Sequence, residues 1–317
     1  MEFLISVVIP VYNGERFIEK AICSAIQQSE VSEVVVVNDG STDKTQNILE
    51  KLQSQFPKLK IYYHKNFENK GRSASRNLGI KMANGNYIAF LDADDFYLPN
   101  RFLNDEKVFK ISDKADGVYN AIGVHFYRDT NTLEEEKLKL TTVNRKIEPE
   151  ALFEALLFGT DGHFSIDGLT VMKSIFDAVG YFTESMPISE DTELIFKMAL
   201  KGHLEPGIID RPVAMRGVHD TNVFNREDLY EKYRVKMYES LFFWSNKKNI
   251  ERYSIDKLLS VLWVLKYKQK KSLLGYISYW VFLFTKNPKS LFSTLSIKYF
   301  PIIRLRQKLF PFLYKQK

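Results

Sequence analysis

Three aspartates, Asp92, Asp94 and Asp95, lie within four residues of one another, directly after the apolar run 88–91. Carboxylates this close repel one another at low dielectric unless a cation neutralises them. Hard oxygen ligands suit Mg²⁺ or Mn²⁺, which keep open positions for substrate phosphates. The cluster therefore predicts a divalent-metal site. The alternative is a solvated turn that caps a helix starting near Pro99.

Two further polar clusters, 10–15 and 38–41, follow apolar runs that are typical of buried strands. The Asp39 carboxylate could accept a hydrogen bond from a base N–H of a nucleotide, although Asp-Gly is also a common turn pair. Neither cluster, nor the aspartate cluster, follows the glycine-rich dinucleotide fingerprint, which disfavours an NAD-type site. A helix start at 71–77 carries two arginines, which would suit a diphosphate.

A pair of acids, Glu190 and Asp191, begins a predicted helix with an apolar stripe. Acids in a first helical turn often only complement the helix dipole. The functional alternative is a general base that a rigid element holds at the edge of a pocket.

The hydrophobic pattern predicts the elements that must position these residues. Short β-rich runs alternate with amphipathic helical patterns in the first hundred residues, which indicates a mostly parallel α/β sheet covered by helices. Ligands bind such sheets beyond the carboxyl ends of the strands, where the polar clusters lie. The predicted strands are 5–9, 33–37, 61–64 and 87–91, and the helices between them include 16–28 and 73–82. Further along, the pattern predicts helices at 99–110, 148–158 and 189–201, a strand at 117–128, and a charged loop or hairpin at 131–139.

The charge is distributed unevenly along the 317 residues, of which 45% are hydrophobic, as in a globular protein with a real core. Of the 45 basic and 39 acidic residues, 226–317 hold 20 and 6, a balance of +14, which leaves −8 for 1–225. Such a split points to two regions with different partners. We therefore predict domains at 1–225 and 226–317.

The second region is predicted to be helical, aromatic and basic, and Lys257 to Lys317 contain no acidic residue against 13 basic ones. Lysines interleaved with aromatics suit an anionic membrane surface. Packing as a helical subdomain is the alternative. No nucleic-acid module is recognised, so no nucleic-acid partner is expected. The residues behind the membrane hypothesis are Leu258, Leu259, Val261, Leu262, Trp263, Leu265, Tyr267, Tyr276, Tyr279, Trp280, Phe282 and Phe284, with Lys266, Lys268, Lys270, Lys271 and Lys286.

Neither a leader nor a spanning segment is expected. The first ten residues lack the basic region of a secretory signal, and the uncharged stretch 272–285 has 14 residues, fewer than the roughly 20 that a spanning helix needs. The single cysteine, Cys23, excludes a disulfide framework and a cysteine-based zinc site. We expect a cytoplasmic protein, peripheral on the inner face of a membrane.

Taken together, the motifs resemble those of the family 2 glycosyltransferases of the GT-A fold. The resemblance covers about residues 4–220, and its matching stretches are SVVIPVYNGERFIEKAICSAIQQ, VVVVNDGSTDKT, NKGRSASRNLGIKMANGNYIAFLDADD and GYFTESMPISEDTELIFKMALKG. It implies a GT-A Rossmann-like sheet with flanking helices, with the basic helical region following it. It also implies a nucleotide-sugar donor, with UDP the usual nucleotide, and a divalent metal cofactor, Mn²⁺ or Mg²⁺.

The resemblance assigns roles to the matching residues. Asp191 would be the catalytic base, taking the proton of an acceptor hydroxyl in a single displacement that inverts the anomeric carbon. The metal would be bound by Asp94, with His219 closing over it and the diphosphate. The residues implied at the nucleotide are Pro10, Tyr12, Glu15, Asp39, Arg76 and Asp92.

Many members of the family extend lipid-linked glycans at a membrane, so a glycan or lipid-linked glycan acceptor is expected. Two alternatives come from other classes. A sugar-phosphate nucleotidyltransferase should carry a glycine- and arginine-rich loop after the first strand, where residues 12–15 read YNGE. A non-catalytic sugar-nucleotide-binding or scaffold protein would not need the intact set of Asp39, Asp94 and Asp191.

Overall fold

The computed structural model describes residues 2–220, 222, 227–269, 272–286, 288, 291 and 294–314. The chain divides into two compact units, Met1–Glu227 and Asp228–Lys317. The domain boundary predicted between 225 and 226 lies outside the described residues.

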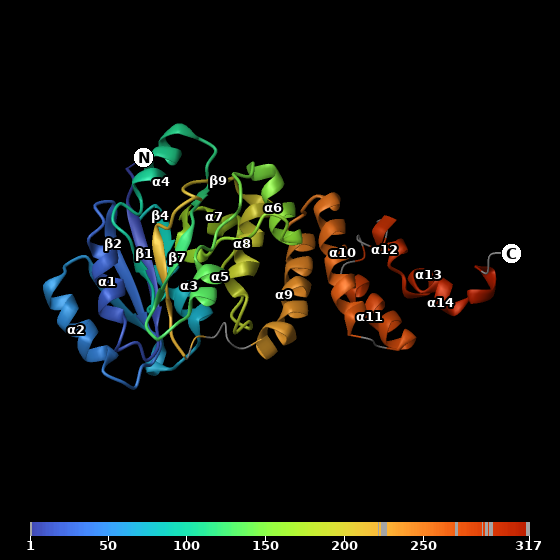
Figure 1. Cartoon of the computed structure of the whole chain (residues 1–317), viewed down its shortest axis with the longest axis horizontal. Coiled ribbons are helices and arrows are strands. Elements are labelled where there is room, and N and C mark those ends of the chain that lie inside the picture. The colour runs from blue at the N-terminus through green and yellow to red at the C-terminus, as the bar shows by residue number, and fades with distance from the viewer. Residues whose placement is uncertain are drawn as a thin grey trace. The chain divides into compact units, whose positions relative to one another are not determined.

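A seven-stranded sheet forms the centre of the first unit (Figure 1). Strands β3, β2, β1 and β4 are parallel, whereas β8 pairs antiparallel with β4 and β6. The strands, in their order across the sheet, are β3 (Leu59–Tyr63), β2 (Val31–Asn38), β1 (Ile5–Val11), β4 (Tyr87–Phe90), β8 (Leu169–Met172), β6 (Gly117–Tyr119) and β9 (Leu204–Pro206). The predicted mostly parallel α/β sheet is confirmed.

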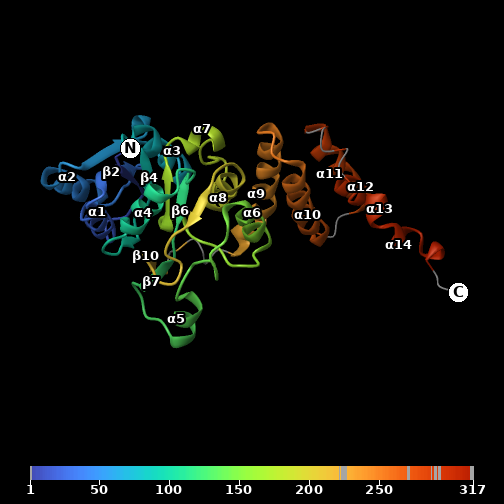
Figure 2. The ribbon, with the colours of Figure 1, turned by 90° about the horizontal axis from the view of Figure 1, so that it is seen from above.

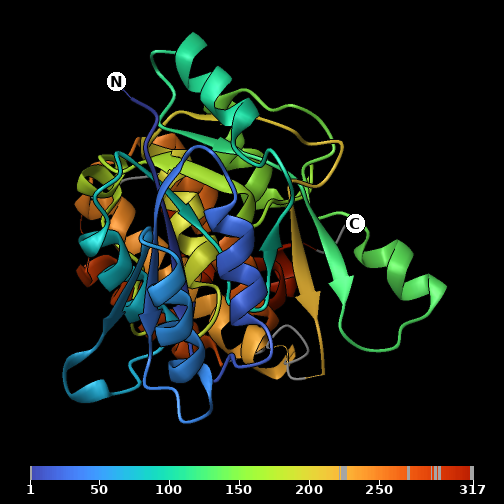
Figure 3. The same cartoon turned by 90° about the vertical axis from the view of Figure 1, so that its left-hand side faces the viewer.

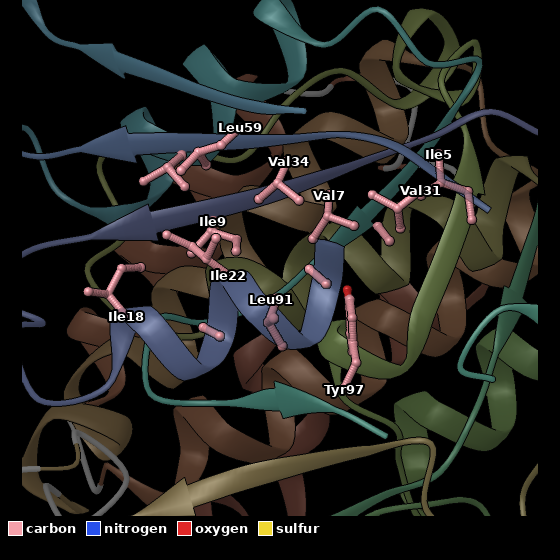
Figure 4. Packing of buried hydrophobic residues seen from close by; sticks show 14 of the residues in the cluster. Ile5, Val7, Ile9, Ile18, Ile22, Val31, Val34, Leu59, Leu91 and Tyr97 are labelled. Carbon is pink, nitrogen blue, oxygen red and sulfur yellow. The ribbon is translucent and has the colours of Figure 1, made fainter. Parts of the chain in front are cut away.

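Helices cover both faces of this sheet. Figure 3 shows α1 and α2 in front of it, and side chains of α1 such as Ile18 and Ile22 pack on Val7 and Ile9 of β1 (Figure 4). Because strand side chains alternate, Val8 points to the other face and meets α3. A Cβ at Gly79 would lie 2.4 Å from Val8 Cγ1, so the close packing of α3 requires glycine there. The bounds are α1 (Ile18–Ile26), α2 (Thr45–Gln55), α3 (Arg72–Met82), α4 (Leu103–Ile111), α6 (Pro149–Phe158), α7 (Ile175–Val179) and α8 (Glu190–Lys201).

A second, three-stranded sheet has the order β5-β10-β7. Its strands are β5 (Phe96–Tyr97), β10 (Ala214–Val218) and β7 (Ile122–Phe126). Strand β5 comes directly after the aspartate cluster, and β10 pairs antiparallel with it and parallel with β7. This small sheet therefore brings a late segment of the unit beside the predicted metal motif.

The sequence-based prediction was wrong in two places. The strand expected at 117–128 is broken at Asn120, whose buried amide donates to Asp105 Oδ1 and to the Gly168 carbonyl, each at 3.0 Å. The chain thereby leaves the large sheet after β6 and enters the small one as β7.

The loop or hairpin expected at 131–139 is the helix α5 (Thr132–Leu138), which stands off from the sheet in Figure 2. The Asn131 side chain caps it by accepting the Glu134 N–H at 3.0 Å.

The second unit is helical. Its core is aromatic, since the Trp263 ring is fully buried and lies against the rings of Tyr267, Tyr279 and Tyr299. No helix among the described residues is long and apolar enough to cross a membrane. The elements are α9 (Glu227–Lys247), α10 (Arg252–Lys268), α11 (Leu273–Lys286), α12 (Thr294–Lys298), α13 (Pro301–Arg304), α14 (Arg306–Leu309) and the short 3₁₀ turn η5 (Pro311–Leu313).

Candidate active site

The aspartate cluster forms a turn at the carboxyl end of β4. The N–H of Asp92 donates to Asp167 Oδ1 at 3.0 Å, and the N–H of Asp95 donates to the Asp92 carbonyl at 3.0 Å. The Gly217 N–H of β10 donates to Asp95 Oδ1 at 2.8 Å. A Cβ at Gly217 would lie 2.2 Å from the Asp94 carbonyl oxygen, so only glycine allows β10 to approach the turn this closely. The turn is thus fixed from two sides.

Arg76 connects this turn to the helix that carries the predicted base. Its guanidinium is 1% exposed and donates to Asp92 Oδ1 at 2.5 Å and to Glu190 Oε1 at 2.9 Å. Arg72, one turn earlier in α3, reaches the same Glu190 oxygen at 3.0 Å. Burial would raise the pKa of Asp92, but the charges of Arg76 and Arg72 outweigh burial and hold that pKa below its ordinary value. Arg76 therefore holds α8 and the aspartate turn together.

Asp191 is the more accessible of the two acids at the start of α8. Its Oδ1 accepts the Thr192 N–H at 2.7 Å, whereas its Oδ2 has no hydrogen-bond partner among the described residues. Glu190 is 1% exposed and its Oε1 is held by both arginines, and burial together with the Asp191 charge raises the pKa of Glu190. An unengaged carboxylate oxygen on a rigid helix is what a general base requires.

The two residues predicted to hold the metal lie side by side, although 125 positions separate them. His219 Nε2 is 2.9 Å from Asp94 Oδ2, and the amide of Asn222 donates to the same oxygen at 3.2 Å. The Phe17 ring stacks on the His219 ring with centroids 4.9 Å apart. The sequence-based analysis placed Asp94 and His219 here but missed Asn222.

The donor set fits a hard divalent cation. Asp92, Asp95 and Asp167 each offer a carboxylate oxygen, and these oxygens lie within 4.8 Å of one another. Burial, followed by the charges of Asp167 and Asp94, raises the pKa of Asp95 well above its ordinary value. Burial, followed by the Asp92 charge, raises the pKa of Asp167 to about 6. A bound cation would relieve this repulsion, and carboxylate oxygens are the ligands that Mg²⁺ and Mn²⁺ prefer.

Asp39 lies at the end of β2, where the sequence placed it, and is 3% exposed. Its two oxygens accept the N–H groups of Lys70 and Gly71 at 2.7 and 2.8 Å, and His64 Nε2 lies 3.5 Å away. These contacts fix the loop that leads into α3. Each oxygen has a second lone pair and can accept another hydrogen bond. The predicted contact of Asp39 with the edge of a base is therefore compatible with these contacts and stays a prediction.

The loop after β1 is tied to the loop after β2. Glu15 Oε2 accepts the Lys44 N–H at 2.9 Å, and the Gly14 N–H donates to Thr45 Oγ1 at 2.9 Å. Pro10 is buried within β1, whereas the Tyr12 ring is 52% exposed at its end. An exposed ring at this edge could pack beside a base. The nucleotide roles of these residues stay predictions.

Arg216 is a site residue that the sequence-based analysis missed. Arg216 is half-buried on β10. Burial would lower its pKa, but the charges of Asp95, Asp167, Asp191 and Asp92, which come from three segments, outweigh burial and raise that pKa. The guanidinium has no hydrogen bond to any other described side chain or backbone group. Nothing in the sequence indicated that Arg216 belongs to the site, because the acids that act on it lie at positions 92 to 191, far from it along the chain.

An Arg216→Ala variant is expected to raise the KM for a nucleotide-sugar donor by roughly 10- to 100-fold, since a charged hydrogen bond is worth about 1.5–3 kcal/mol. The reason is that the resemblance implies a diphosphate at this site, and the Arg216 guanidinium makes no hydrogen bond within the part of the chain that the structure describes. Steady-state kinetics with varied donor measures the effect. The exposed Arg211, which precedes β10, is the control, and Arg211→Ala should leave KM unchanged. An unchanged KM in Arg216→Ala contradicts the prediction.

Comparison with known proteins decides the family. Residues 6–173 match the model of glycosyl transferase family 2. The chain belongs to this family. An uncharacterized glycosyltransferase of Rickettsia typhi is 31% identical over 235 residues, which are 70% of this chain and 66% of that protein. Another, from Rickettsia felis, is 32% identical over 207 residues, 62% of this chain and 31% of that protein.

Solved structures agree on the fold of this family 2 member. A crystal structure of S. aureus TarS 1-349 in complex with UDP-GlcNAc is 19% identical, with a TM-score of 0.63 over 96% of this chain and 91% of that one. The GT-A fold expected from the motifs is thereby confirmed. The chain spans between about a third and two thirds of the length of the two Rickettsia relatives.

Proposed function

We propose that this family 2 member transfers a hexosyl or N-acetylhexosaminyl group from a nucleotide sugar, with UDP as the favoured nucleotide, to a hydroxyl of a glycan or lipid-linked glycan. The observation that carries the proposal is that the charges of the aspartate turn and of Asp191 act on Arg216, while His219 lies against Asp94 of the same turn. These groups come from β4, β10 and α8. Together they supply the charges that a sugar-diphosphate displacement needs.

In the proposed reaction the acceptor oxygen forms a bond to the anomeric carbon while the bond from that carbon to the diphosphate oxygen breaks, with inversion. Asp191 Oδ2 takes the acceptor proton, since it is the carboxylate oxygen without a partner among the described residues. Arg216 offsets the negative charge of the departing diphosphate. A divalent cation, Mn²⁺ or Mg²⁺, held by Asp94 and His219 would add a Lewis acid at that diphosphate. The group of Asp92, Asp95 and Asp167, whose carboxylate oxygens lie within 4.8 Å of one another, is the alternative set of ligands for such a cation.

We further propose that residues 1–225 perform the catalysis and that 226–317 associate with an anionic membrane surface, on the cytoplasmic face. The charge balances of −8 and +14 support this division. A lipid-linked acceptor would be met at such a surface. Measuring turnover of the donor separates the two alternatives, because a non-catalytic scaffold protein would bind the nucleotide sugar without consuming it.

The donor site is tested by thermal unfolding of the full chain with UDP-, GDP- and dTDP-sugars, with and without Mn²⁺. At a hundred times Kd a ligand adds about 2.7 kcal/mol, which for a unit of this size raises Tm by roughly 5–10 °C. We expect one nucleotide to do so, in the presence of metal only, and Asp94→Ala to abolish the shift. The exposed Asp113 provides the control variant, Asp113→Ala. No stabilisation by any nucleotide in folded protein would sink the proposal.

A further inference from the structure

Exposed apolar side chains gather in residues 297–314 of the second unit, here named the 297–314 segment. Phe312 and Leu313 are 69% and 66% exposed, and Ile297 is 54% exposed. Further along the same segment, Ile302, Ile303, Phe310 and Tyr314 are each between 38% and 44% exposed. The segment runs through α12, α13, α14 and η5, drawn in red in Figure 1. A water-facing surface this rich in large apolar side chains indicates an interaction site.

The aromatic residues that suggested membrane contact from sequence lie elsewhere and are mostly buried. Trp263 is fully buried, and Tyr276, Tyr279 and Phe284 are 9% exposed or less. The Tyr279 hydroxyl donates to Glu239 Oε1 at 2.7 Å inside the unit. Lys270 and Lys271 of the same prediction lie outside the described residues. Packing therefore accounts for these four aromatics, whereas Phe282 of α11, which belongs to the same prediction, is 42% exposed.

The 297–314 segment is fixed to the unit at its base. Tyr299 is 8% exposed and stacks on the Trp263 ring at 6.5 Å, and the Phe300 ring meets the Trp280 ring at 5.0 Å. The next residue, Pro301, is also buried. The packing of residues 299–301 thus attaches the segment to the rest of the second unit, and the exposed apolar residues lie before and after this attachment.

Charge selects the partner. Lys298, Arg304, Arg306 and Lys308 are all exposed within the segment, and no acidic residue occurs anywhere from Lys257 onward. A partner must therefore be anionic on its surface and apolar beneath it. A bilayer containing anionic lipids has both properties, whereas a nucleic acid offers no apolar layer for Phe312. The helices α12, α13 and α14 have four or five residues each, too few to span a bilayer.

We propose that the 297–314 segment is the membrane-contacting surface of this protein. The side chains of Phe310, Phe312 and Leu313 enter the boundary between headgroups and acyl chains. Arg304, Arg306 and Lys308 meet the lipid phosphates. The inference rests on the membrane association proposed above and specifies which residues make it.

Co-sedimentation of the full chain with vesicles tests the inference. The vesicles contain equal parts of phosphatidylglycerol and phosphatidylcholine, or phosphatidylcholine alone. We expect binding to the anionic vesicles and a loss of roughly 10-fold or more in the double variant Phe312→Ser/Leu313→Ser, because the two exposed apolar side chains proposed to enter the bilayer are removed. Leu274→Ser is the matched control, since Leu274 of α11 is 77% exposed but lies outside the segment. It should bind as the unmodified chain does.

A second variant reports insertion directly. Phe312→Trp fluorescence should be quenched by vesicles with brominated acyl chains, beyond the quenching of the unmodified chain, whose three tryptophans include the buried Trp263. Unchanged Tm in all variants shows that the fold is kept.

The outcomes separate the two proposals. No binding of the unmodified chain to anionic vesicles removes the membrane association itself. Binding that the double serine variant retains in full, or that Leu274→Ser reduces equally, leaves association standing and overturns the role of the 297–314 segment. Equal binding to vesicles with and without anionic lipid overturns the proposed contact of Arg304, Arg306 and Lys308 with the lipid phosphates.

Discussion

Asp191→Asn is expected to lower kcat by about 10²- to 10⁴-fold, the range for loss of a general base, and to leave donor binding within about twofold. Asparagine keeps the shape and the hydrogen bond that Oδ1 accepts from the Thr192 N–H, but it cannot take the acceptor proton. Single-turnover kinetics with saturating donor measures the chemical step. Donor Kd, obtained from thermal shift, measures binding separately.

The choice of Asp191 over its neighbour has a structural reason. Glu190 is buried and its Oε1 is held by both Arg72 and Arg76, so its contacts link α8 to α3. The exposed Asp177 of α7 is the control, and Asp177→Asn should retain full turnover. If Asp191→Asn kept kcat within twofold of the unmodified enzyme, another group would have to accept the proton.

Much of the fold follows from local pattern. The continuous valines of β2 and the apolar stripe of α1 predict a sheet buried on both faces, and the polar clusters after β1, β2 and β4 then fall at one edge. The break between β6 and β7 had no such signal. It depends on the Asn120 amide meeting Asp105 and the Gly168 carbonyl, which are distant in sequence.

The site divides in the same way. Asp94 and Asp191 stand out because acids cluster locally in the chain. Asp167 and Arg216 do not, since their importance comes from neighbours up to 124 residues away. In the second unit the composition predicts basic and aromatic helices, but only packing separates the buried Trp263 from the exposed Phe312.

Arg76 shows most clearly what a motif leaves out. The resemblance places it near the nucleotide, whereas its contacts are with two carboxylates from segments 16 and 114 residues away. That nucleotide role stays a prediction. The position of the arginine between Asp92 and Glu190 makes it a positioning residue for both the aspartate turn and α8.

Arg76→Met is accordingly expected to destabilise the fold by about 3–5 kcal/mol, because it leaves the buried Glu190 and the half-buried Asp92 with one counter-charge fewer. For a unit of this size that lowers Tm by roughly 6–20 °C. Turnover should fall as well, since α8 carries Asp191. Thermal unfolding and kcat, measured on the same preparation, report the two effects.

The double variant Arg76→Met/Glu190→Met distinguishes charge from shape. Replacing both partners by apolar residues removes the unpaired buried carboxylate, so Tm should recover by several degrees relative to Arg76→Met. Turnover should not recover, because the link between α8 and the aspartate turn is still missing. Arg72→Met is the control on the same helix, and its side chain is 35% exposed, so a smaller loss of Tm is expected. Equal decreases of Tm in Arg72→Met and Arg76→Met would contradict this prediction. They would mean that the burial of Arg76 between its two carboxylates adds nothing to the stability of the fold.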